Sequence, residues 1–199
     1  MDYGYEFQFD KYYCYPDSNV FKNKLNITDS NQLKKAEREI TSLKTAQILT
    51  TRIKGNFDFT HLRKIHHFLF SDIYEWAGQI RVVDISKGSL FCKYEFIEKE
   101  ADKLFKELKD NNYLKNCKDK NDLIKQLAYY LGEINAIHSF REGNGRCQRI
   151  FIEHLSFHLG YNFDFMEITT KEMMEASIDS FNGNNTKLEL SISKALSKI

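Results

Sequence analysis

Hydrophobic residues recur every three or four positions along most of this chain, which is the spacing expected of amphipathic helices. The pattern predicts helices over about 30–50, 58–70, 97–110, 120–137, 146–159, 167–181 and 186–197. The apolar face of the first helix is expected to hold Leu33, Ala36, Ile40, Leu43, Ala46 and Ile48. About seven helices with little strand between them predict an all-α domain, a helical bundle.

One segment departs from the helical spacing. Residues Ile80–Ile85 form a β-branched run after a turn at Gly78, and Lys87–Tyr94 follows as a turn and a returning strand. β-Branched runs bounded by turn residues favour strands, so residues of about 81–94 are expected to form the only hairpin, a small β flap.

The N-terminal region has a different pattern, because its aromatic residues alternate. Tyr3, Tyr5, Phe7 and Phe9 favour a short edge strand or, more simply, an arm packed on the domain. A turn containing the only proline, Pro16, and a polar connection follow. We therefore expect an aromatic arm and turn over 1–29 and one domain over 30–199, since 199 residues suit a single core.

Charge and cysteine usage narrow the classes of function. The chain has 29 basic and 28 acidic residues, a net charge of +1, which offers no footprint for direct binding of nucleic acid or an anionic membrane. Its four cysteines are scattered and form no metal or redox motif. With no signal-like segment and no long apolar run, a cytoplasmic protein is expected.

The densest chemistry lies in residues 138–149, HSFREGNGRCQR. Gly143, Asn144 and Gly145 suit a tight loop, and the helical pattern begins directly after them. A helix N-terminus binds anions through its unpaired N–H groups, and Arg146 and Arg149 add two donors one turn apart. The stretch therefore predicts a site for several phosphates.

Two further residues of the stretch suggest a reaction. Glu142 would repel bound phosphate unless a hard cation such as Mg²⁺ lay between them, and His138 could accept a proton from an attacking hydroxyl. Together they indicate nucleotidyl or phosphoryl transfer. The alternative is a simple capping turn with a packed histidine and solvated arginines. The histidines outside the stretch, at 61, 66, 67, 154 and 158, lack further ligands and are interpreted as structural.

The stretch resembles the signature of the Fic family, which is His, any residue, Phe, any residue, Asp or Glu, Gly, Asn, Gly, Arg, two of any residue, Arg. The segments YPDSNVFKNKLNI, AEREITSLKTAQI and YEWAG also resemble that family in the same order. The resemblance implies that His138 is the base, Phe140 anchors the loop, Glu142 binds Mg²⁺, and Gly143 to Gly145 hold the α- and β-phosphates. Arg146 and Arg149 would hold the outer phosphates.

The reaction implied by the resemblance is transfer of AMP from ATP to a Ser, Thr or Tyr hydroxyl of a target protein. The flap, with Lys87, Gly88, Ser89 and Leu90, would clamp the target by strand addition and could touch the nucleotide. Ser139 stands where many family members carry Pro, so the start of the loop lacks a fixed φ. Other donors remain open, namely UMP, phosphocholine or the γ-phosphate of ATP, as does a non-catalytic nucleotide-binding module.

Many Fic proteins restrain themselves with an inhibitory helix of pattern Ser or Thr, three of any residue, Glu, then Gly or Asn, whose Glu pairs with the second motif arginine, here Arg149. The only Glu followed by Gly or Asn in this chain is Glu142, in the loop itself. The chain thus resembles the antitoxin-regulated class, bacterial cell filamentation proteins that transfer AMP to DNA gyrase and topoisomerase IV. The resemblance implies a toxin and a separate helical antitoxin.

Overall fold

The computed structural model of the protein describes residues 10–199, and these form a helical bundle with two very short sheets. The helices are α1 (Ser30–Thr51), α2 (Phe59–Phe70), α3 (Ile97–Asp110), α4 (Lys120–Ile137), α5 (Asn144–His158), α6 (Thr170–Phe181) and α7 (Thr186–Ala195). The antiparallel strand pairs are β1 (Ser86–Lys87) with β2 (Ser89–Leu90), and β3 (Tyr161–Phe163) with β4 (Leu196–Lys198). The all-α class with a small flap is confirmed. The aromatic alternation at residues 3–9 lies outside the described residues.

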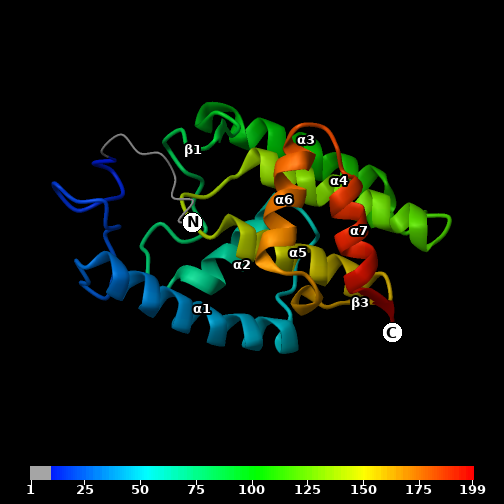
Figure 1. Cartoon of the computed structure of the whole chain (residues 1–199), viewed down its shortest axis with the longest axis horizontal. Helices are drawn as coiled ribbons and strands as arrows, with labels where there is room; N and C mark the ends of the chain where they lie inside the picture. Colours follow the sequence, from blue (N-terminus) through cyan, green and yellow to red (C-terminus); the bar gives the residue numbers. More distant parts are fainter. Residues whose placement is uncertain (1–9) are drawn as a thin grey trace.

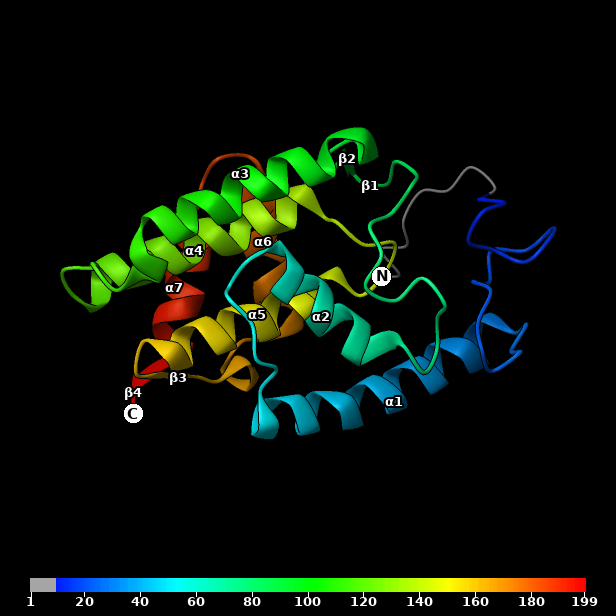
Figure 2. The same cartoon turned by 180° about the vertical axis from the view of Figure 1, so that it is seen from behind.

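Helix α5 lies at the centre of the bundle. It packs against α2 and α4 and touches α1, which runs along one side of the molecule (Figure 1). Helices α3 and α4 lie side by side on the opposite side, with the flap near one end of α3 (Figure 2). Phe151, Ile152 and Leu155 of α5 are fully buried. The loop before α5 is therefore held between several elements.

Polar side chains determine where the helices begin. Asp29, Asp58 and Asp119 accept a backbone N–H at the starts of α1, α2 and α4, as N-cap residues do. The expected start of α6 at Glu167 is wrong, because Phe165–Glu167 is a separate 3₁₀ turn. Thr169 and Glu172 then form a capping box that sets the start of α6.

The inner face of α1 differs from the expected one. Leu33, Thr41 and Ile48 are its buried residues, whereas Leu43 is 75% exposed and Ala46 is also exposed. The expected apolar face is thus wrong at these two positions. The face of α1 that packs against the domain therefore includes polar residues. One of them is Thr41, whose hydroxyl makes hydrogen bonds with Glu37 O and Arg146 Nη1.

The flap is much shorter than expected. Each strand has two residues, joined at Gly88 with a φ of +76°, and the predicted strand over 81–85 is absent. Its backbone groups bond elsewhere: the Arg81 N–H donates to Ser139 O at 3.0 Å and the Val82 N–H donates to Tyr13 Oη at 3.1 Å. These tertiary bonds override the β propensity of the run.

The flap is also not the only strand pair. Tyr161–Phe163 pairs with Leu196–Lys198, so α7 ends at Ala195 rather than at Ser197. Gly160, with a φ of +82°, lies between the end of α5 and this sheet, in the conformation that glycine favours after a helix.

The described part of the N-terminal region is packed on the domain. Tyr13 and Val20 belong to the hydrophobic core, and Cys14 pairs with Phe21 in an isolated β-bridge. The segment between α4 and α5, residues 138–143, is called the active loop below. Asp10 forms a buried ion pair with Arg141 of this loop, with 2.8 Å between Oδ2 and Nε. Residues 10–22 therefore support the loop.

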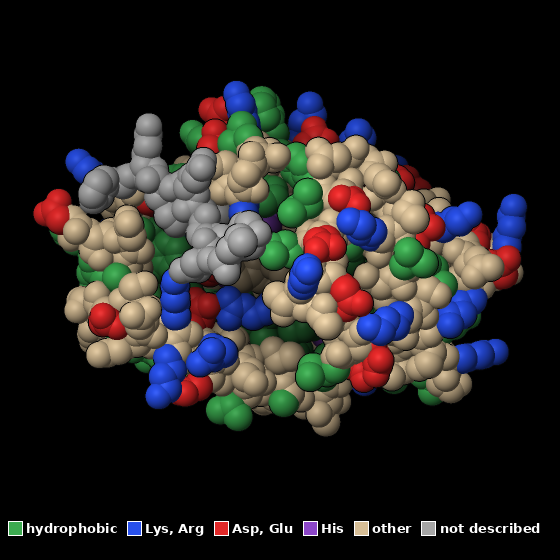
Figure 3. All heavy atoms as spheres, viewed as in Figure 1, with side chains coloured by type: hydrophobic (Ala, Val, Ile, Leu, Met, Phe, Trp, Pro, Cys, Tyr) green, Lys and Arg blue, Asp and Glu red, His purple; other side chains and the backbone are tan. Residues whose placement is uncertain are grey.

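On the face in Figure 3, the Lys and Arg side chains are interspersed with Asp and Glu, consistent with a net charge of +1. No described helix combines the length and the apolar character needed to cross a bilayer.

Candidate active site

His138 lies where α4 ends and the active loop begins. It is the C-cap residue of α4 with a φ of +49°, a left-handed conformation that is costly outside glycine and is common at functional sites. Its Nδ1 lies 3.0 Å from Asn135 O, and because a carbonyl only accepts, Nδ1 carries the proton. Nε2 is therefore the basic nitrogen of the neutral ring.

The imidazole of His138 is held in a buried position. It stacks on Phe91, the residue after β2, with 3.8 Å between ring centroids and 16° between planes. Burial lowers the pKa of His138 to about 3, and the nearby Arg81 and Lys87 charges also lower it. His138 is thus neutral near pH 7 and able to accept a proton.

Arg81 holds the backbone around His138. Its buried guanidinium donates to His138 O from Nε at 2.8 Å and to Val83 O from Nη1 at 2.6 Å, and it also donates to Cys92 O. The backbone N–H of Arg81 donates to Ser139 O. The start of the loop, which lacks the proline of many Fic proteins, is thereby fixed through Arg81.

Asn144 closes the loop on itself. Its Oδ1 accepts the Phe140 N–H at 2.9 Å, and its Nδ2 donates to Phe140 O at 2.7 Å. Phe140 is buried and stacks on His66, with 3.9 Å between ring centroids. Both polar atoms of the Asn144 side chain thus bond within the loop. An anion could therefore be bound by the backbone N–H of Asn144 but not by its side chain.

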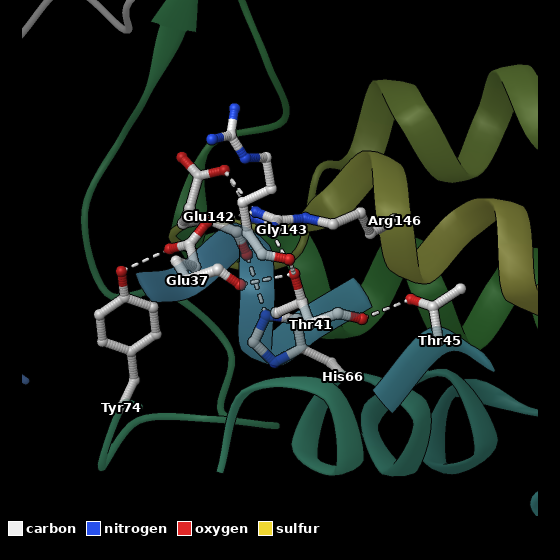
Figure 4. Close-up of polar contacts among 9 residues, drawn as sticks. Glu37, Thr41, Thr45, His66, Tyr74, Glu142, Gly143 and Arg146 are labelled. Atoms are coloured by element: carbon white, nitrogen blue, oxygen red, sulfur yellow. Dashed lines mark hydrogen bonds and ion pairs between the residues drawn. The ribbon is translucent and has the colours of Figure 1, made fainter. Parts of the chain in front are cut away.

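His66 of α2 supports the loop through a hydrogen bond to its backbone. Its Nε2 donates to Glu142 O at 2.9 Å (Figure 4), while its Nδ1 accepts the Gly78 N–H at 2.8 Å. Burial lowers the pKa of His66 to about 3, so the neutral tautomer with a proton on Nε2 makes both bonds. Gly143 lies against Phe70, whose ring would be 2.2 Å from an added Cβ, so only glycine fits there.

The two motif arginines project from the start of α5 and differ in their partners. Arg146 contacts Glu37 of α1, with 2.6 Å between Nη2 and Oε1, and lies 3.6 Å from Glu142 Oε1. Arg149 lies over Gly145 and has no ion pair with any described carboxylate. Burial and the neighbouring Arg146 charge lower the pKa of Arg149. Arg149 beside the N-terminus of α5 is an arrangement that fits an anion.

The flap lies near His138, since Lys87 acts on its charge and Phe91 stacks on its ring. Lys87, Gly88, Ser89 and Leu90 are exposed. A pocket of about 380 Å³ opens next to Leu90 and Phe91. Glu100, Glu107 and Glu133 line it with a single lysine, Lys103. This acidic lining is unsuited to a triphosphate, whereas the loop at 142–149 carries Arg146 and Arg149.

The sequence of this chain matches the Fic/DOC family over residues 56–156, about half of its length, and the match contains the loop and α5. The chain belongs to the Fic/DOC family.

The sequences of similar proteins align with nearly the whole of this chain. It is 39% identical to a probable protein adenylyltransferase, y4lH, of Sinorhizobium fredii, over 92% of this chain and 94% of that one. It is 38% identical to the probable protein adenylyltransferase Fic of Escherichia coli, over 94% and 92%. The structure of BepC from Bartonella tribocorum with bound AMPPNP superposes with a TM-score of 0.88 at 27% identity, covering 94% of this chain and 97% of that one.

A Fic domain from Bartonella quintana with bound ADP gives a TM-score of 0.88 at 28% identity, over 94% of both chains. The predicted family and fold are therefore confirmed. The roles assigned to single residues stay predictions.

The Fic loop has a carboxylate that fits a divalent cation. Glu142 Oε1 accepts the Gly143 N–H at 2.8 Å, and Oε2 makes no hydrogen bond with the described residues. Burial raises the pKa of Glu142, and the Glu37 carboxylate raises it further. A cation at Oε2 would favour the ionised form of this carboxylate. None of the groups of His, Cys, Asp and Glu in residues 10–199 forms a three-ligand metal site.

Sequence reasoning overlooked several residues that support the Fic motif. Arg81, His66, Glu37 and Asp10 all contact the loop or its arginines. No local sequence pattern marks these residues, because each contacts a residue that is distant in the sequence. From the sequence alone, His66 is a histidine that lacks further metal ligands. The other helical histidines are structural neighbours: His61 and His154 lie together, with 5.7 Å between ring centroids.

Proposed function

We propose that this chain is a protein adenylyltransferase that transfers AMP from ATP to a hydroxyl side chain of a target protein. The observation that carries the proposal is the juxtaposition of a neutral, oriented imidazole at His138 with the anion site at the start of α5. The names of the similar proteins from Sinorhizobium fredii and Escherichia coli support the same activity. The AMPPNP and ADP bound to the Bartonella domains support a nucleotide ligand.

His138 is the general base. Its Nε2 takes the proton of the target hydroxyl, whose oxygen then forms a bond to the α-phosphorus of ATP as the bond to the β-phosphate oxygen breaks. Pyrophosphate leaves, and the target retains AMP. A bound triphosphate places negative charge near His138 and raises its pKa, which makes the imidazole a stronger base during the reaction.

The loop binds the phosphates. The backbone N–H groups of Asn144 and Gly145 bind the α- and β-phosphates, and the Gly143 N–H joins them when Glu142 Oε1 releases it. Arg146 and Arg149 bind the outer phosphates. Glu142 would hold Mg²⁺, which supplies charge neutralisation at the phosphate oxygens when bound. Phe140 keeps the loop in the core.

The target chain docks on the flap. Residues 87–90 are exposed, and each flap strand has two residues, so a target segment added to its edge is held by only a few main-chain bonds. DNA gyrase and topoisomerase IV are the targets that we propose, which implies a cytoplasmic protein.

A separate antitoxin restrains the enzyme in this proposal. Its helix would lie beside α1 and direct a glutamate to Arg149. Two observations support such a partner: Arg149 has no ion pair among the described residues, and Leu43 and Leu49 of α1 are 75% and 38% exposed. Coexpression with a small helical protein that carries the inhibitory pattern should abolish transfer by the wild type, and Arg149→Ala should bind that protein more weakly in a titration without nucleotide.

The test of the activity is incubation of the full chain with Mg²⁺, ATP labelled at the α- or γ-phosphate, and bacterial lysate or purified gyrase and topoisomerase IV. We expect label from the α-phosphate only, and a loss of about 10²-fold or more in His138→Ala. His158→Ala, an exposed histidine at the far end of α5, is the matched control and should behave as the wild type.

Other outcomes separate the alternatives. Label from the γ-phosphate would make the protein a phosphate-transferring branch of the family. If purified targets and lysate take no label although the protein binds ATP, another donor or a non-catalytic role replaces the proposal. Equal transfer by His138→Ala would overturn the assignment of the base.

A further inference from the structure

Helix α1 presents polar side chains to the active loop at two positions one turn apart. Glu37 and Thr41 lie on the side of α1 that faces the start of α5 (Figure 4). The Glu37 side chain is only 13% exposed, and Thr41 is buried. Buried polar groups of this kind need partners, and both find one in Arg146.

The two residues hold both ends of the Arg146 guanidinium. Nη2 donates to Glu37 Oε1 at 2.6 Å, and Nη1 donates to Thr41 Oγ1 at 3.0 Å. The plane between them lies over the Phe70 ring, with 4.7 Å from Cζ to the ring centroid. An arginine held at two nitrogens and on one face has little rotamer freedom left.

Glu37 is itself held in place. Tyr74 Oη donates to its second carboxylate oxygen, Oε2, and the Thr41 hydroxyl donates to Glu37 O at 2.7 Å. The Thr41 hydroxyl therefore directs its hydrogen to α1 and accepts from Arg146. The network from Tyr74 through Glu37 to Arg146 is consistent in every donor and acceptor.

We propose that Glu37 is a positioning residue for nucleotide binding: it orients Arg146 so that the remaining N–H groups of its guanidinium meet the outer phosphates. This inference rests on the proposed function for the role of Arg146. The guanidinium has five N–H groups, of which Glu37 and Thr41 take one each. Arg149 has no such support among the described residues, so the two arginines act differently: Arg146 is preorganised, and Arg149 adapts.

A carboxylate near a phosphate site could also act in the opposite direction. Glu37 contributes negative charge beside Glu142, and simple repulsion would weaken binding of a triphosphate. The two effects predict opposite signs when the carboxylate is removed. Orientation predicts weaker binding, because the freed arginine side chain must be ordered again by the ligand.

The test measures binding of AMPPNP and of AMP, each with Mg²⁺, to the full chain by titration calorimetry. Glu37→Ala should weaken AMPPNP binding about 10-fold and leave AMP binding unchanged, since AMP has no outer phosphates. Thr41→Val, which keeps the shape of the side chain, should weaken AMPPNP binding about 3-fold. In steady-state assays of transfer, the loss should fall mainly on KM for ATP.

The decisive comparison is made in an Arg146→Ala background. If Glu37 acts through Arg146, Glu37→Ala there should cause no further loss of AMPPNP affinity. Asp72→Asn is the matched control, because it removes another α1 ion pair, Lys44 with Asp72 at 2.8 Å, away from the arginine. It should leave both affinities unchanged.

Three results would overturn the inference: unchanged or tighter AMPPNP binding in Glu37→Ala, an equal loss for AMP, or the same loss in the Arg146→Ala background. If Glu37→Ala does not fold, as judged by thermal unfolding, Thr41→Val carries the same comparison. Transfer is measured separately. Weaker binding in Glu37→Ala without AMP transfer by the wild type would overturn only the proposed function, and transfer without the affinity change would overturn only this inference.

Discussion

The two ends of α5 use similar residues in different ways. Each end has a glycine with a positive φ, +78° at Gly143 and +82° at Gly160, and each half of the helix has a buried histidine beside it. At the N-terminal end, the His66 nitrogens both make hydrogen bonds. Farther along, neither ring nitrogen of His61 or His154 has a hydrogen-bond partner within residues 10–199.

The difference indicates what each buried polar group does. A buried group with satisfied hydrogen bonds fixes its neighbours in one arrangement, and His66 thereby fixes the carbonyl of Glu142. A buried group without partners carries a desolvation cost and fixes nothing. The active loop is thus the part of α5 where polar burial positions chemistry. Substitutions at corresponding places on the two ends should separate loss of activity from loss of stability.

The glycines should give the largest contrast. In Gly143→Ala the new Cβ would lie 2.2 Å from the Phe70 ring, and the left-handed backbone adds strain, so the loop must move. A displacement of about 1 Å at a catalytic constellation costs roughly 10²-fold in rate. We expect at least that loss in the initial rate of AMP transfer from α-labelled ATP.

Gly160→Ala is the matched control for the loop glycine. No atom lies within 4 Å of its added Cβ, so only the left-handed conformation is penalised, by roughly 1–2 kcal/mol. Thermal unfolding should shift down by a few degrees while the transfer rate is retained. Equal losses of rate in the two variants would mean that the loop geometry is not what limits transfer.

The local parts of this architecture could be predicted from the sequence. The loop at 138–149 and the helix over 58–70 follow from residues that are near one another in the chain. The supporting contacts could not be predicted in this way, because Arg81 to His138, His66 to Glu142 and Arg146 to Glu37 span 57, 76 and 109 residues. No periodicity reports such a pairing.

The two main errors have the same origin. The run Ile80–Ile85 has strand propensity, but the bonds of Arg81 and Val82 to Ser139 and Tyr13 hold it in another conformation. On α1, the assumption that apolar residues face inward placed Leu43 in the core. Glu37 and Thr41 take the inner side because the active loop offers them an arginine.

The histidines should give the next largest contrast. In His66→Leu the buried Gly78 N–H and the Glu142 carbonyl lose their partner, which costs roughly 1–3 kcal/mol of folding free energy. Because Glu142 O is then released, we expect about a 10-fold loss in kcat/KM for transfer. Chemical unfolding and steady-state kinetics on the same preparation measure the two effects.

His154→Leu makes the same substitution at the other site. No hydrogen bond is lost there, and the side chains are similar in volume, so the free energy of unfolding should change by less than about 1 kcal/mol. Transfer should stay at the wild-type rate. A strong loss of activity in this variant would show that the C-terminal half of α5 also positions the loop.

The last contrast concerns the pH dependence of stability, with no effect expected on the transfer rate at pH 7. Burial, with a contribution from His61, lowers the pKa of His154 to about 4, and burial lowers the pKa of His61 as well. Arg52 and Glu153 are charged groups that face His154, and Asp58 and Lys64 act on His61. In the unfolded chain both histidines titrate near 6.5, so between about pH 6.5 and 4 the unfolded state binds more protons.

The contribution of these histidines to the free energy of unfolding is therefore fully present above pH 6.5. It should fall as the pH drops toward 4, by at most roughly 1.4 kcal/mol per pH unit for each such histidine. Denaturant unfolding of the wild type and of His154→Leu, measured at intervals from pH 7.5 to 4.5, tests this. The variant should show a shallower slope, because one of the protons taken up on unfolding is gone. Identical slopes would mean that His154 is not buried in its neutral form, and the contrast between the two ends of α5 would then rest on the loop alone.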